Sequence, residues 1–136
     1  MKGSCAPYRC FGDVFPDDPD RIRKPDASFI RMDRLPSGPL PQGHCDIVPD
    51  LVVEVISPND LYGEVEDKVE EYLAAGVRLV WVIYPPHKAI RIHRANGSVQ
   101  DLKATTELTG EDVIPGFRCP VSELFRRASI ERESRP

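Results

Sequence analysis

One acidic residue interrupts an otherwise aliphatic segment of the chain. Glu54 lies in the middle of the sequence LVVEVI, which spans residues 51–56. An unpaired buried charge costs several kcal/mol, so such a group is normally paired, protonated or bound to a cation. The alternative is an edge strand on which the Glu54 side chain faces solvent, and the segment by itself allows both interpretations.

Two aspartates could join Glu54 in a metal site. Asp26 and Asp50 each follow a proline directly and stand before an apolar segment. Carboxylates presented by neighbouring strands form a hard-oxygen site that suits Mg²⁺ or Mn²⁺. An aspartate after a proline is also common in turns, so this pattern alone has low specificity.

Lys68 is the cationic candidate for the same site. It lies on the flank of the apolar stripe of the helical segment 63–75, at about 100° per residue, and could lean toward the strand of Glu54. The alternative is a surface lysine that offsets Glu64 and Glu71 at helical spacing. The helical pattern alone favours the surface lysine.

Regular elements that could position these residues lie between proline-rich stretches. The sequence predicts strands over 26–32, 51–56 and 79–84, a helix over 63–75, and a hairpin over 89–94 and 98–103. Gly76 stands where a helix C-cap belongs, and Asn59 or Asp60 can cap the start. The Asn-Gly pair at 96–97 is typical of a hairpin turn. The order strand, strand, helix, strand, hairpin indicates a mixed α/β fold.

The length and composition indicate a single domain outside the membrane. The chain has 136 residues, of which 40% are hydrophobic and 29% charged, as in ordinary globular domains. Its longest apolar run, residues 79–84, is far shorter than the ~20 residues of a membrane-spanning helix. No secretory signal is visible, so a cytoplasmic location is expected. The proline-rich segments 1–25 and 35–49 are expected to be an irregular lead-in and a surface loop.

The four cysteines show no CxxC pair. In a chain without an export signal they are expected to be reduced thiols. A zinc site could be drawn from Cys5, Cys10, His44 and Cys45. The spacing of these residues matches no zinc finger or ribbon, so the sequence does not favour this site.

The charge distribution bears on binding to nucleic acid. A net charge of −4 argues against a wholly basic nucleic-acid coat. Residues 72–100, however, contain no Asp or Glu, and their basic side chains include Arg78, Lys88, Arg91 and Arg94. These four are candidate contacts for a nucleic-acid backbone, with ordinary solvated residues as the alternative.

A long string around the candidate residues resembles a known family. The segment PDLVVEVISPNDLYGEVEDKVEEYLAAGVRLVWVIYPP, with RKPDASFIRMDRLP before it and GEDVIPGFRCPVSELF after it, resembles the Uma2 (DUF820) family. These are bacterial restriction-endonuclease-like proteins of the PD-(D/E)XK nuclease superfamily. The resemblance runs over residues 12–125 of a single domain, and residues 1–11 and 126–136 are expected to be irregular.

The resemblance implies a restriction-endonuclease-like core, in which a mixed β-sheet with flanking helices carries a divalent-metal site on two adjacent strands. Asp26 and Glu54 match the acidic positions of the family, which would bind Mg²⁺ or Mn²⁺. Ile56 occupies the usual lysine position of the superfamily, and Lys68 matches a catalytic lysine moved onto the following helix. Asp50 is kept as a reserve ligand. The implied reaction is the hydrolysis of DNA phosphodiester bonds.

The N-terminal part of the chain raises a competing hypothesis. Uma2 proteins normally begin with a further helix and strands, whereas this chain begins near the middle of the pattern. A truncated core could be a catalytically inactive remnant that acts as a binding or interaction module, and an uncovered sheet edge would favour a homodimer. Glycoside hydrolysis by paired carboxylates is disfavoured, because a single tryptophan leaves little aromatic surface for a sugar.

Overall fold

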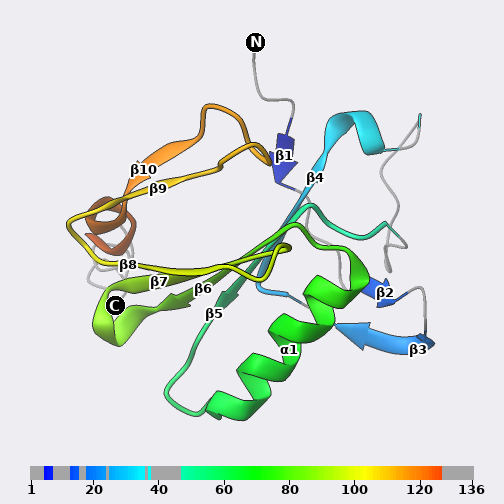
Figure 1. Ribbon diagram of the computed structural model, residues 1–136, viewed down its shortest axis with the longest axis horizontal. Coiled ribbons are helices and arrows are strands. Elements are labelled where there is room, and N and C mark those ends of the chain that lie inside the picture. Colours follow the sequence, from blue (N-terminus) through cyan, green and yellow to red (C-terminus); the bar gives the residue numbers. More distant parts are fainter. Residues whose placement is uncertain are drawn as a thin grey trace, which may run out of the picture.

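A six-stranded mixed β-sheet forms the centre of the protein (Figure 1). The computed structural model describes residues 5–7, 13–15, 18–23, 25–35, 37 and 47–126, and the side chains of those from residue 25 onward. The strand order is β1-β4-β5-β6-β7-β8, and among these strands only β5 and β6 pair in parallel. A parallel pair needs a crossover connection, which here is helix α1 (Tyr62–Ala75). The mixed α/β fold predicted from the sequence is confirmed.

The predicted strands and the hairpin are present with nearly the predicted bounds. The sheet consists of β1 (Cys5–Pro7), β4 (Ala27–Arg31), β5 (Leu51–Val55), β6 (Leu79–Tyr84), β7 (Ala89–Arg94) and β8 (Val99–Leu102). In the turn between β7 and β8, Gly97 has a φ of +90°, the left-handed conformation that tight hairpin turns require. Of these six strands, only β1 lies outside the predicted set.

Helix α1 spans the predicted segment but begins with a different cap. At its end, Gly76 adopts a left-handed conformation with a φ of +109°, which is the predicted C-cap. At its start the N-cap is Leu61, so the predicted cap by Asn59 or Asp60 is wrong. The Asp60 carboxylate instead accepts a hydrogen bond of 2.7 Å from the Ser57 N–H, within the preceding turn. Neither this helix nor any other in the described part of the chain is long and apolar enough to cross a membrane.

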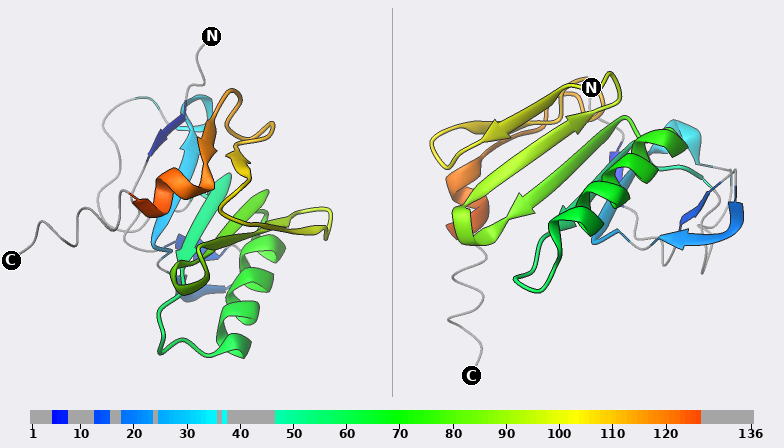
Figure 2. Two further views of the ribbon diagram at one scale, coloured as in Figure 1. Left: turned by 90° about the vertical axis from the view of Figure 1, so that its left-hand side faces the viewer. Right: turned by 60° about the horizontal axis from the view of Figure 1, so that its bottom comes forward.

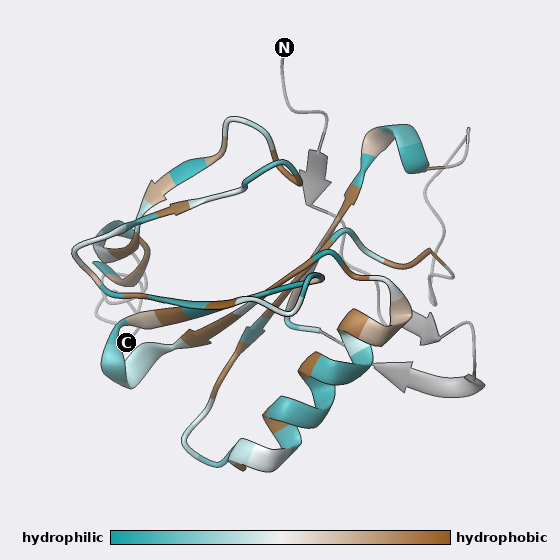
Figure 3. Cartoon of the chain, in the orientation of Figure 1, coloured by the Kyte–Doolittle hydropathy of each residue, from teal (hydrophilic) through white to brown (hydrophobic). Residues whose placement is uncertain are grey.

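Both faces of the sheet are covered, which explains the long aliphatic runs of β5 and β6. One core lies between the sheet and the apolar stripe of α1 (Figure 3), and its buried residues are Val52, Val65, Val69, Tyr72, Val77, Val80 and Val82. On the opposite face, β9 (Glu107–Thr109), β10 (Arg118–Pro120) and the helical residues 121–126 cover the second core (Figure 2). Because side chains alternate along a strand, Glu54 lies on the α1 face with Val52.

The N-terminal lead-in differs from the sequence expectation. Strand β1 pairs antiparallel with β4, within the segment 1–11 that was expected to be irregular. Strands β2 (Asp13–Phe15) and β3 (Asp18–Arg23) form a separate two-stranded sheet. Proline is compatible with edge strands, where one side of the strand needs no N–H donor. The prolines of these segments therefore hid short strands from pattern-based prediction.

Candidate metal centre

The register of β4 and β5 brings Asp26 beside Glu54. The two strands are antiparallel, and Ala27 pairs with Val53. The next position outward places Asp26, which directly precedes β4, opposite Glu54 on β5. The two carboxyl groups are close enough for Asp26 to raise the pKa of Glu54. The structure thus brings these two candidate ligands together from adjacent strands.

Glu54 is a buried carboxylate with a short hydrogen bond. It is 6% exposed, so the solvent-facing alternative does not hold. The Tyr72 hydroxyl donates a hydrogen bond of 2.6 Å to Oε1 of Glu54. Burial is the largest cause that raises the pKa of Glu54, and it outweighs the lowering by Tyr72 and Lys68. Ionisation of Glu54 is therefore unfavourable unless a further positive charge lies nearby.

Asp26 is tied to the end of β5 through its own side chain. Its Oδ2 accepts a hydrogen bond of 2.7 Å from the backbone N–H of Val55. An ionised carboxylate has about four acceptor sites, so this bond leaves capacity for a cation. Asp26 is exposed whereas Glu54 is buried, so the pair has one side open to solvent and one side in the core.

Lys68 lies near the carboxylate pair from the side of the helix. It is half-buried on α1, one turn before Tyr72. Its positive charge lowers the pKa of both Glu54 and Asp60, so it lies near both carboxylates. None of the ion pairs found in the described part of the chain includes Lys68. Its ammonium group is therefore available to a ligand.

The donor set fits a hard divalent cation. Asp26 and Glu54 offer only carboxylate oxygens, which are the ligands that Mg²⁺ and Mn²⁺ prefer. Within the described residues, no group of three or more His, Cys, Asp or Glu side chains could hold a metal ion. Mg²⁺ commonly binds one or two carboxylates and completes its shell with water and phosphate oxygens. The pair therefore fits a site that also uses the substrate as a ligand.

A hollow of about 350 Å³ adjoins the carboxyl ends of β5 and β6. It is lined by Val55, Ile56, Ser57, Pro58, Pro85 and Pro86. Val55 directly follows Glu54 and binds Asp26 through its N–H, so the hollow lies next to the carboxylate pair. Ligands of sheets with parallel strands commonly bind outside the carboxyl ends of those strands. Neither Asp26 nor Glu54 lines the hollow, and Val55 is the lining residue that connects it to the pair.

Tyr72 is the functional candidate that sequence reasoning missed. Its helical spacing predicted a core residue, and it is indeed 2% exposed in the core under α1. A buried tyrosine hydroxyl normally needs a hydrogen-bond partner, and this rule is the signal that could have pointed to an acceptor. The sequence could not identify Glu54 as that acceptor, because the two residues are 18 positions apart and meet only through the crossover.

Asp50, the reserve ligand, is not part of the cluster. It is 5% exposed, and its Oδ1 forms an ion pair of 2.8 Å with Arg34. Its Oδ2 accepts a hydrogen bond of 2.9 Å from the backbone N–H of Arg31. Four residues of extended chain, about 13 Å, separate Asp50 from Glu54. Asp50 therefore secures the end of β4 and cannot bind the same cation as Glu54.

Arg91 is the basic candidate in the row of Glu54, and Lys88 lies in the turn before the same strand. Glu54 pairs with Val82, which in turn pairs with Arg91, so Arg91 is two strand spacings or about 10 Å from Glu54. Its guanidinium forms an ion pair of 2.7 Å with Asp101, which raises the pKa of Arg91. Lys88 is exposed at the turn before β7.

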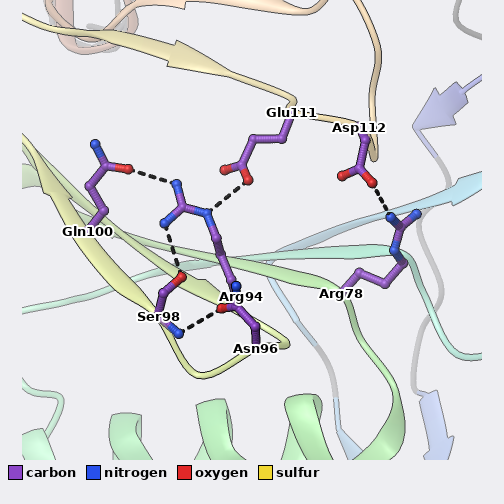
Figure 4. Close-up of polar contacts among 7 residues, drawn as sticks. All are labelled: Arg78, Arg94, Asn96, Ser98, Gln100, Glu111 and Asp112. Carbon is purple, nitrogen blue, oxygen red and sulfur yellow. Dashed lines mark hydrogen bonds and ion pairs between the residues drawn. The ribbon is translucent and has the colours of Figure 1, made fainter.

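Arg78 and Arg94 lie at the other end of the sheet and are already paired (Figure 4). Arg78 forms an ion pair of 2.6 Å with Asp112, and Arg94 forms one of 2.8 Å with Glu111. The backbone N–H of Arg78 donates to the carbonyl of Asp50 at 3.2 Å, which places Arg78 at the Asp50 end of β5. The four basic candidates therefore do not form one continuous surface around Glu54.

The zinc alternative falls on residues whose side chains lie outside the described part of the chain, namely Cys5, Cys10, His44 and Cys45. Cys119, on β10, is a free thiol. The carboxylate pair is therefore the metal-site candidate that the described residues support.

Comparisons with known proteins address the family. The model of the Uma2 family, described as "Putative restriction endonuclease", matches residues 10–122, which is most of the chain. A solved structure from Anabaena variabilis ATCC 29413, described as a "putative nuclease belonging to DUF820", is similar with a TM-score of 0.78 and 17% identity, covering 91% of this chain and 69% of that one. No curated protein gives a significant match. The structural likeness shows a shared fold, and the family match over most of the chain shows that the protein belongs to the Uma2 family.

Proposed function

We propose that this chain is a Mg²⁺-dependent endonuclease that hydrolyses DNA phosphodiester bonds at the Asp26–Glu54 pair. The observation that carries the proposal is a buried carboxylate held against a second carboxylate at facing positions of two adjacent strands. Such a pair is unfavourable by itself, and a divalent cation would stabilise it. The description of the family as a restriction endonuclease supports the nuclease class.

In this proposal, Asp26 and Glu54 hold the cation and Lys68 acts on the substrate. A bound Mg²⁺ would polarise a phosphoryl oxygen and lower the pKa of a coordinated water. Lys68 lies close enough to Glu54 to lower its pKa, so its ammonium would also be near a phosphate at the site. There it would neutralise negative charge that develops in the transition state, or orient the attacking water. Its position on a helix holds this charge in a fixed place relative to the strands.

DNA binding would use Arg91, in the row of Glu54, and Lys88, in the turn before β7. Lys88 is exposed, and Arg91 is paired with Asp101, which is itself 57% exposed and could release the guanidinium to a phosphate. Contacts of this kind release counterions, so the affinity for DNA should fall steeply with salt concentration. A homodimer would present two such sites to the two strands of a duplex. Analytical ultracentrifugation would test whether the chain forms this dimer.

Cleavage of supercoiled plasmid in the presence of Mg²⁺ or Mn²⁺ tests the proposal. The wild type should nick the plasmid, EDTA should stop it, and Glu54→Ala and Lys68→Ala should each lower the rate at least about 100-fold. Glu70→Ala is the matched control, since Glu70 is an exposed residue of the same helix and should be dispensable.

Two results would contradict the proposal in different ways. Nicking that persists in Glu54→Ala would show that the carboxylate pair is not the metal site. A folded wild type without any nicking would favour the competing function, in which the core binds a partner and has no catalytic activity.

A further inference from the structure

We propose that Tyr72 is a positioning residue of the metal centre, whose hydroxyl holds Oε1 of Glu54 so that Oε2 is directed toward the cation. The inference rests on the proposed function, since it takes Glu54 as a metal ligand. It goes beyond that function because it assigns the orientation of the ligand to a residue that contacts neither the cation nor the substrate.

The hydrogen bond itself has the geometry of a strong, fixed contact. The Tyr72 hydroxyl and Oε1 of Glu54 are 2.6 Å apart, within the range of short charge-assisted O–H···O⁻ bonds. Tyr72 is 2% exposed and Glu54 is 6% exposed, so water does not compete freely for either group. The tyrosine ring packs in the core under α1, which fixes the position of the hydroxyl.

The strand alone cannot orient the Glu54 carboxylate. A glutamate side chain has three rotatable bonds, and fixing them on metal binding opposes that binding. A carboxylate that is already held in its binding orientation avoids this loss. The hydrogen bond holds Oε1 toward Tyr72, and Asp26 on the neighbouring strand lies within reach of the same carboxyl group. In this proposal Oε2, which accepts no bond from Tyr72, is the oxygen that Glu54 offers jointly with Asp26.

The same contact couples the helix to the strands. Lys68 and Tyr72 are four residues apart on α1, so they lie on one face of the helix, one turn from each other. The bond from Tyr72 to Glu54 therefore also sets the distance between the Lys68 side of the helix and β5. Loss of the Tyr72 hydroxyl should mainly affect the orientation of the Glu54 carboxylate, and to a smaller extent the position of Lys68.

The experiment compares Tyr72→Phe with Tyr84→Phe. Both residues pack against the same core. The charged and polar groups that shift the pKa of Tyr84 do not include Glu54; they are Arg91, Glu66, Tyr62 and Asp101. The readout is the Mn²⁺ concentration that gives half of the maximal thermal stabilisation, which does not depend on catalysis. We expect Tyr72→Phe to raise this concentration about tenfold or more, as loss of an orienting partner does, and Tyr84→Phe to leave it unchanged.

The possible outcomes separate this inference from the proposed function. Cleavage by Tyr72→Phe should recover in part at high Mn²⁺, because orientation is lost and the ligands remain. Thermal stabilisation that is present in the wild type, absent in Glu54→Ala and unchanged in Tyr72→Phe would overturn the positioning role and leave the metal site intact. A wild type with no Mn²⁺-dependent stabilisation would overturn both.

A measurement on the wild type covers the case in which Tyr72→Phe does not fold. The chain has four tyrosines, so their ring ¹³Cζ signals can be resolved after labelling and assigned through Phe variants of Tyr8, Tyr62 and Tyr84. The Tyr72 signal reports on its hydroxyl, and it should move during a Mg²⁺ titration while the Tyr84 signal stays in place. A Tyr72 signal that does not respond to saturating Mg²⁺ would refute the inference.

Discussion

Two buried carboxylates at opposite ends of strand β5 have different surroundings. Asp50, at its start, is 5% exposed and Glu54, near its end, is 6% exposed. Each oxygen of Asp50 has a donor, one from the Arg34 guanidinium and one from the Arg31 N–H. Glu54 accepts a hydrogen bond from the neutral Tyr72 hydroxyl and faces Asp26, a second carboxylate, while the nearby Lys68 forms no ion pair with it. Burial therefore does not distinguish the paired carboxylate from the candidate metal ligand, whereas the balance of surrounding charge does.

The physical reason lies in desolvation. Burial removes the hydration of a carboxylate, and a cationic partner with well-placed donors compensates for that loss at Asp50. At Glu54 the compensation is incomplete, so burial raises its pKa. A residue whose charge is unfavourable in its own protein is a candidate for binding a cation, because the cation removes the cost. The comparison leads to four tests.

Removal of Asp50 should damage the fold and spare the metal site. Asp50→Ala leaves the Arg31 N–H without its acceptor and Arg34 without its partner. Because Arg34 can regain water, we expect a loss of about 2 kcal/mol in the free energy of unfolding, measured by urea denaturation. Stabilisation of the remaining folded protein by Mn²⁺ should persist. Loss of that stabilisation would place Asp50 in the metal site and break the comparison.

Neutralisation of Glu54 should raise the free energy of unfolding, whereas removal of Asp50 should lower it. Glu54→Gln keeps an acceptor for the Tyr72 hydroxyl and removes a buried charge that faces Asp26. We expect the variant without added metal to be more stable than the wild type by about 1 kcal/mol, and to show no stabilisation by Mn²⁺. A destabilised Glu54→Gln variant would mean that Glu54 is a structural carboxylate like Asp50.

The gain from Glu54→Gln should depend on pH. Burial raises the folded pKa of Glu54 above its ordinary value of 4.5, so the wild type loses stability as pH rises through that folded pKa and Glu54 ionises. Below pH 4.5 Glu54 is protonated in both the folded and the unfolded chain, and the difference between wild type and variant should vanish. Urea denaturation of both proteins at pH 4 and at neutral pH measures this difference. A gain that is equal at the two pH values would point to packing and not to charge.

Much of the fold was predictable because its signals are local. The aliphatic runs of β5 and β6, the period of α1 with Gly76 after it, and the Asn-Gly turn each depend on a few consecutive residues. Strands β1, β2, β9 and β10 are three residues long, and such segments carry no detectable period. Their pairing depends on tertiary contacts, which a local pattern does not contain.

The candidate site was predictable in composition but not in arrangement. A glutamate inside an aliphatic strand is visible in the sequence, and so is an aspartate before another strand. The difference between Asp50 and Glu54 is not visible in the sequence, because it depends on distant partners. Arg34 lies 16 residues before Asp50, and Tyr72 lies 18 residues after Glu54. The register of β4 against β5 decides which carboxylate meets Asp26, and no local pattern sets that register.

The smallest effects should come from the arginines, and they extend the comparison to the substrate. Arg78 lies at the Asp50 end of β5, and Arg91 lies in the row of Glu54; both are paired with exposed aspartates. Replacing either by Ala should cost less than about 0.5 kcal/mol of stability, because exposed ion pairs contribute little.

The two arginines should differ in DNA binding, measured by fluorescence anisotropy at several salt concentrations. If DNA lies across the carboxylate pair, Arg91→Ala lowers the affinity and reduces the salt slope by about 1, which corresponds to one phosphate contact, whereas Arg78→Ala changes neither. Equal effects of the two variants would mean that the acid-free stretch binds DNA without regard to the metal centre. An effect of Arg78→Ala alone would place the DNA at the Asp50 end, which would separate the binding surface from the candidate catalytic residues.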